Sequence, residues 1–115
     1  MSFKEHGIGN GCTSYTKNGK KVFDAEYVPI RELCKERWLI TIIDFETECP
    51  GRDGKNDSCW ILFEFDGEPN TKYKTCTTSC RIIRKLQKGA EMKIFPETTF
   101  VFSVKSKGHN TYDID

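Results

Sequence analysis

Two short runs of β-branched and aromatic residues, Trp38–Phe45 and Cys59–Phe65, constrain the fold of this chain most strongly. Each run is too short for a buried helix, and its residue types are typical of strands. The first run is apolar on both faces up to Asp44, which predicts a central strand. In the second run, alternation places Cys59, Ile61, Phe63 and Phe65 on one face and Trp60, Leu62 and Glu64 on the other. The polar segment 46–58 between them carries turn signals, so we expect a hairpin with a long tip.

The remaining segments predict further strands and one principal helix. The expected strands are Val22–Val28, Lys72–Cys76, Phe100–Val104 and Tyr112–Ile114. The helix is expected from Cys80 to Lys88, because hydroxyl residues that can cap a helix precede it and Gly89 follows it. Its buried stripe consists of Ile82, Ile83 and Leu86. Pro29 predicts one additional helical turn, with Ile30 and Leu33 facing inward.

The length of the chain fits one domain. Its net charge predicts little electrostatic attraction to polyanions such as nucleic acids. The 115 residues are typical of a single domain, and 18 basic against 17 acidic residues give a net charge of +1. A strongly basic nucleic-acid binder has a different balance, so any electrostatic attraction depends on where the charges lie. Residues 1–20 are polar and lack an apolar period, which predicts a flexible arm before a domain at 21–115.

The six cysteines raise the question of a metal site. The N-terminal residues lack the apolar region of a signal peptide, so we expect a reducing, cytoplasmic location and free thiols. Four thiolates can hold a tetrahedral zinc, and the candidates are Cys49, Cys59, Cys76 and Cys80. Their spacing lacks the two-residue gaps of zinc knuckles, so we expect no metal and no cofactor, and keep a zinc-stabilised domain as an alternative.

Catalysis is not expected from this sequence. A nucleophilic cysteine needs a base, and the two histidines, His6 and His109, lie in the terminal arm and a late polar loop. No glycine-rich phosphate loop or zinc-protease signature is present. We therefore expect a binding protein and no enzyme.

Basic residues interleaved with aromatic residues provide the main functional signal. Lys72, Tyr73 and Lys74 precede a helix that carries Arg81 and Arg84. Lys105 lies in the last hairpin, and the indoles of Trp38 and Trp60 are candidates for stacking. Proteins that bind single strands combine cations for the phosphates with aromatic faces for the bases. This pattern predicts a single-stranded nucleic-acid partner.

Several short motifs resemble a family of small single-stranded-DNA-binding-like proteins of phages and mobile elements. The motifs are Val28–Leu33, Trp38–Glu46, Trp60–Phe63, Tyr73–Ser79 with Ile82, Ile83 and Leu86, and Phe95–Thr99. The resemblance covers roughly residues 22–114 and implies a five-stranded OB-like barrel that binds DNA in replication or recombination. An open antiparallel sheet packed on one helix is the alternative fold. The six cysteines and the long Cys49–Cys59 connection depart from the family pattern.

A protein-interaction module is the competing function. The near-neutral charge favours it, because a protein interface needs no excess of lysine and arginine. A phage-encoded inhibitor of a host enzyme is an example of such a module.

Overall fold

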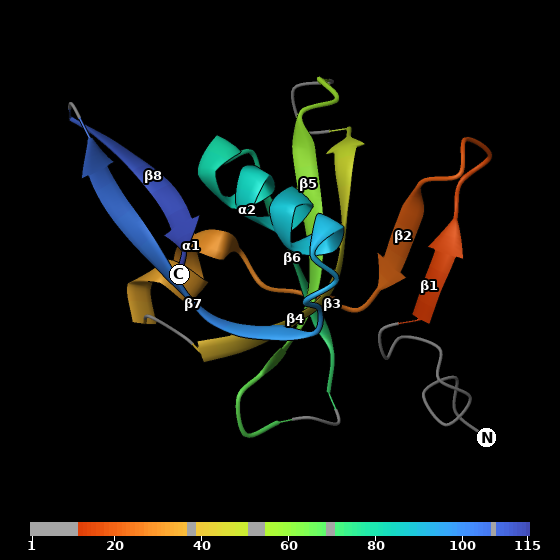
Figure 1. Cartoon of the computed structure of the whole chain (residues 1–115), viewed down its shortest axis with the longest axis horizontal. Coiled ribbons are helices and arrows are strands. Elements are labelled where there is room, and N and C mark those ends of the chain that lie inside the picture. The colour runs from red at the N-terminus through yellow and green to blue at the C-terminus, as the bar shows by residue number, and fades with distance from the viewer. Residues whose placement is uncertain (1–11, 37–38, 51–54, 69–70, 107) are drawn as a thin grey trace.

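The computed structural model describes residues 12–36, 39–50, 55–68, 71–106 and 108–115. Figure 1 shows strands grouped around two helices, with a two-stranded hairpin at one side. In chain order the elements are β1 (Cys12–Tyr15), β2 (Lys21–Asp24), β3 (Glu26–Tyr27), α1 (Ile30–Glu36), β4 (Leu39–Cys49), β5 (Ser58–Phe65), β6 (Tyr73–Thr77), α2 (Cys80–Glu91), β7 (Glu97–Ser106) and β8 (His109–Ile114). The fold is mainly β, as the sequence predicts.

Six of the strands form one sheet in the order β3-β6-β5-β4-β7-β8. β3 and β6 are parallel, and the other neighbours are antiparallel. β4 lies between β5 and β7, which confirms the prediction of a central strand. Within the described residues no ladder joins β8 to β3 or β6, so the sheet is open rather than closed into a barrel.

A register shift in β4 decides which side chains face the core. Ile42 pairs with Phe63, but Asp44 pairs with the preceding residue of β5, Leu62, so Ile43 is an extra residue in β4. Because side chains alternate along a strand, one extra residue moves the following side chains to the opposite face. Ile42 is therefore in the core, whereas Asp44 lies on the other side of the sheet.

The described residues form two helices, whereas one principal helix and a single turn were expected from the sequence. α1 has seven residues, and its inward stripe of Ile30, Leu33 and Cys34 is buried. This stripe has the i, i+3, i+4 spacing of an amphipathic helix, and it stabilises more than one turn because all three side chains join the core.

The prediction that α2 ends at Lys88, before Gly89, is wrong, because the helix continues to Glu91. A Cβ at Gly89 would lie 3.1 Å from both Ile94 and Phe95, so this glycine allows close packing of the following segment. The predicted start is confirmed: Ser79 caps the helix, and its hydroxyl accepts a hydrogen bond from the Ile82 N–H.

The core lies between the sheet and the two helices. Its buried residues are Ile30, Leu33, Cys34, Ile40, Ile42, Cys59, Ile61, Phe63, Ile82, Leu86, Val101 and Ile114. The expected inward face of β5 is confirmed, since Cys59, Ile61 and Phe63 are at most 2% exposed. No helix in the described part of the chain has the length and apolar character needed to cross a membrane.

Two thiols in this core are held in the protonated form. Burial raises the pKa of Cys59 to about 12 and that of Cys34 to about 11, from an ordinary value of 9.0. In the unfolded chain both thiols are solvated and ionise near their ordinary pKa. Folding therefore favours the neutral thiols, and their contribution to stability is fully present below pH 9.

We expect the free energy of unfolding to fall as the pH rises above 9. Each buried thiol should cost about 1.4 kcal/mol per pH unit between its unfolded and folded pKa values. Urea denaturation in the presence of a reductant at pH 8, 9 and 10 measures this loss. Cys59→Ala should show a shallower loss above pH 9, and Cys80→Ala, at an exposed position, should keep the wild-type slope. Equal slopes in all three proteins would contradict this account.

Candidate functional site

The side of the sheet opposite the core carries the best candidate site; we call it the outer face. It is formed by β4, β5 and β6, and β5 contributes Trp60, Leu62 and Glu64. The register pairs Leu62 with Lys74 of β6, so lysine and apolar side chains are neighbours there. Lys72, just before β6, has its ammonium 3.7 Å from a Glu64 carboxylate oxygen.

The β1–β2 hairpin is anchored to the β4 part of the outer face. The ammonium of Lys21 lies 2.8 Å from Asp44 Oδ1, and the Lys21 N–H donates to Glu46 at 3.0 Å. Lys20 donates from its ammonium to the carbonyl of Thr47 at 2.9 Å. Burial lowers the pKa of Lys21, but the hydrogen bond and charge of Asp44 and the charge of Glu46 outweigh burial and raise it overall. The hairpin therefore brings two cations to a part of the sheet that is otherwise acidic.

A second set of contacts joins the hairpin to β5 and β6. Lys74 donates from its ammonium to the Phe23 carbonyl at 3.0 Å, and this ammonium lies 5.1 Å from the centre of the Trp60 ring. Tyr27 meets Trp60 edge-on, with ring centres 5.8 Å apart. Phe23 is only 2% exposed although it lies outside the main core, as does Leu62 at 3%. These residues form a small apolar layer on the outer face.

Between the hairpin and the sheet is a pocket of about 210 Å³, which we call the hairpin pocket. Lys20, Lys21 and Lys74 line it, and Trp60 and Phe23 provide aromatic walls. No acidic side chain is among the described residues that line this pocket. The arrangement favours a ligand with an anionic group and a flat apolar part.

The β1–β2 hairpin was not predicted, because residues 1–20 were expected to form an arm. Residues 1–11 lie outside the described part, but Cys12–Tyr15 forms β1 and pairs with β2. Residues 17–19 form the loop, the Gly19 N–H donates to the Thr16 carbonyl at 3.0 Å, and Gly19 has a φ of 79°, which glycine adopts without strain. An Asn-Gly pair before the apolar residues Val22 and Phe23 is a hairpin signal that could have identified this element.

The structure places the remaining predicted residues elsewhere. Tyr73 faces the core side, where its ring packs on Phe63 and Phe65 and its hydroxyl donates to Glu68 at 3.3 Å. Lys105 lies near the tip of the β7–β8 hairpin, at the opposite end of the molecule from the β1–β2 hairpin (Figure 1). Trp38 lies outside the described residues.

Of the two predicted arginines of α2, Arg81 contacts β8. Arg81 lies 3.9 Å from Asp113, and Lys85 lies 3.0 Å from the same carboxylate. Asp113 is buried, so these cations compensate a charge that is removed from water. Arg84 is exposed on the same helix. Of the predicted set, Lys74 contacts the Trp60 ring, and Lys72 lies further along β5, beside Glu64.

The four cysteines of the zinc alternative do not form a metal centre. Cys49 and Cys59 are buried, Cys76 is half-buried and Cys80 is exposed at the start of α2. Across the described ranges, no three His, Cys, Asp or Glu side chains are arranged to hold a metal ion. Burial raises the pKa of Cys49 and of Cys76 as well.

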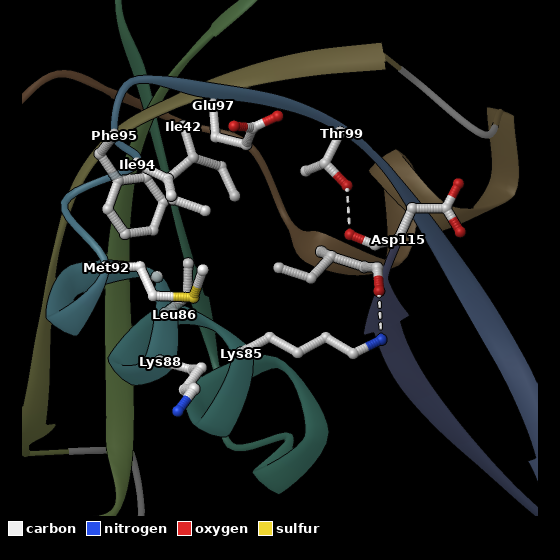
Figure 2. A pocket seen from close by; sticks show the side chains of 12 residues that line it. Ile42, Lys85, Leu86, Lys88, Met92, Ile94, Phe95, Glu97, Thr99 and Asp115 are labelled. Atoms are coloured by element: carbon white, nitrogen blue, oxygen red, sulfur yellow. Dashed lines mark hydrogen bonds between the residues drawn. The ribbon is translucent and has the colours of Figure 1, made fainter.

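A second pocket, of about 260 Å³, lies between α2 and β7 (Figure 2). Leu86, Met92 and Phe95 contribute apolar walls, and Lys88 and Glu97 lie among the polar lining residues. Figure 2 shows the Lys85 ammonium directed away from the apolar wall and bonded to the Ile114 carbonyl. Both pockets have apolar walls, but charged residues of both signs line this one, whereas the charged residues that line the hairpin pocket are lysines.

No protein-family model, no curated protein and no solved structure matches the chain.

We expect Phe23→Ala to detach the β1–β2 hairpin without unfolding the sheet, because Phe23 is the buried side chain of β2. Limited trypsin digestion measures this, since Lys17, Lys20 and Lys21 lie in or beside the hairpin. Cleavage at these lysines should accelerate at least several-fold, in line with the loss of about 3–5 kcal/mol for a buried Phe. Val22→Ala, at a 43% exposed neighbour, is the matched control. Equal cleavage rates in the two variants would show that Phe23 does not anchor the hairpin.

Proposed function

We propose that this chain is a nonenzymatic single-stranded DNA-binding protein and that its outer face holds the strand. The observation that carries the proposal is the grouping of Trp60 with lysines on β6 and on the docked hairpin. Indole faces stack on any base, and lysines neutralise phosphates, so the grouping fits a strand of any sequence.

The order of the strands supports an OB-type arrangement as part of this proposal. If β4 to β8 are taken as the five barrel strands, α2 falls between the third and the fourth. The first strand, β4, then lies between the second and the fourth, and a long first strand shared in this way is typical of OB barrels. OB proteins bind oligonucleotides on the face of their second and third strands, which correspond to β5 and β6.

The balance of charge on the outer face depends on the hairpin. The sheet itself contributes Lys72 and Lys74 against Asp44, Glu46 and Glu64. Docking of the hairpin adds Lys20 and Lys21 beside the carboxylates of Asp44 and Glu46, so that four lysines stand against these three carboxylates. A local excess of this size is compatible with the net charge of +1 and predicts modest affinity.

Oligo-dT binding tests the proposal. Fluorescence titration should give a dissociation constant of about 1–100 µM near physiological salt, and affinity should fall steeply with added salt. Lys72→Met combined with Lys74→Met should lower the slope of log affinity against log salt by about 1.4, because each phosphate contact on a single strand contributes about 0.7. The control is Lys88→Met with Lys93→Met, two exposed positions in the last turn of α2 and just beyond it. Absence of binding at 100 µM protein, or an equal slope in both double variants, would contradict the proposal.

Binding of a protein partner is the second candidate function, and the apolar pocket in Figure 2 favours it. Met92 is 63% exposed and Ile94 is 40% exposed beside this pocket, and exposed apolar groups of this kind occur at protein interfaces. Normal salt-dependent binding of oligo-dT by a Met92→Ser variant would assign DNA binding to the outer face rather than to this patch.

A further inference from the structure

Two of the lysines that line the hairpin pocket, Lys20 and Lys74, hydrogen-bond to groups that carry no net charge. Lys20 and Lys74 each donate to a main-chain carbonyl, of Thr47 and Phe23, and a carbonyl carries no net charge. Among the described residues neither ammonium forms an ion pair with a carboxylate, whereas Lys21 pairs with Asp44. An ammonium has three donors, so Lys20 and Lys74 retain donors for a further acceptor. An anion bound there would meet two cations and no lining carboxylate.

The other walls of the pocket are apolar and partly flat. Trp60 lies on the sheet side and Val22 and Phe23 lie on the hairpin side, with Pro50 at the end of the β4 segment. A volume of about 210 Å³ is smaller than the ~300–1,000 Å³ that is usual for drug-sized ligands. The pocket therefore has room for one ring system and its attached anionic group, and not for a stack of several bases.

We propose that the hairpin pocket binds one nucleotide of the strand, with its base against Trp60 and its phosphate between Lys20 and Lys74. The identity of the ligand rests on the proposed function, whereas the size and charge of the pocket limit it to a single nucleotide unit. The β1–β2 hairpin is then a part of the binding site, because it supplies Lys20 and one wall. Binding of a nucleotide between hairpin and sheet would also hold the hairpin in its docked position.

Titration with a mononucleotide tests this inference separately from strand binding. Thymidine monophosphate, thymidine and inorganic phosphate are each titrated by NMR, with oligo-dT in parallel. Thymidine monophosphate should bind about tenfold more tightly than either fragment, because only it uses the cations and the ring together. The amides of the hairpin and the indole N–H of Trp60 should shift.

Substitutions at Lys20 test whether the phosphate group binds beside its ammonium. Lys20→Met should weaken binding of thymidine monophosphate about tenfold, and Lys20→Arg, which keeps the charge, should restore it. Lys93→Met, at an exposed lysine just beyond α2, is the control and should bind as the wild type does. Rescue by arginine separates loss of charge from loss of the hairpin.

The possible outcomes have distinct meanings. If oligo-dT binds and thymidine monophosphate does not, the inference fails and the proposed function stands. If the mononucleotide binds equally well to Lys20→Met, its site lies elsewhere and the inference also fails. If neither ligand binds, both the inference and the proposed function fail.

Discussion

The extra residue in β4 is the constraint on which the site depends. Before Ile43 the even-numbered side chains of β4, such as Ile42, face the core; after it, Asp44 and Glu46 face outward. Asp44 forms an ion pair with the Lys21 ammonium of the hairpin, and Glu46 accepts a hydrogen bond from the Lys21 main-chain N–H. Without the register shift the acids would point into an apolar core, where an unpaired charge is costly. The bulge thus preserves the core and creates an anchor on the outer face.

The hairpin in turn decides the chemistry of that face. A sheet bearing three carboxylates and two lysines does not attract a polyanion. When the hairpin is docked, Asp44 and Glu46 accept hydrogen bonds from Lys21, and the hairpin covers a pocket beside Trp60. Lys20 and Lys74 hydrogen-bond to carbonyl groups, so their positive charges are not neutralised by those contacts. The near-neutral composition of the chain therefore does not preclude an anion site, because the charges are distributed unevenly in space.

The regular elements could be predicted because each has a strong local pattern. The alternation in Cys59–Phe65 identified β5 and its buried face, and the stripe containing Ile82 and Leu86 identified α2. The end of α2 could not be predicted, because Gly89 serves a packing contact with Phe95 rather than a cap. In the same way, the register shift at Ile43 depends on pairing with β5, which no local pattern reveals.

The candidate site was harder to predict than the fold. Spacing in sequence placed Tyr73 with its neighbouring lysines, but alternation along β6 directs its ring toward Phe63. Arg81 and Lys85 of α2 have a partner, Asp113, that is distant in sequence and becomes their neighbour only when β8 packs on the helix. Lys20 and Lys21 carry no signal of their own, and their role follows from the docking of a hairpin on residues some 25 positions later.

Photo-crosslinking of oligo-dT that carries 5-iodouracil, followed by mass spectrometry of the linked peptides, tests the central claim most directly. The account predicts crosslinks at Trp60 and Tyr27, the aromatic residues of the outer face beside the hairpin pocket. Crosslinks confined to peptides from α2 and the β7–β8 hairpin would contradict it.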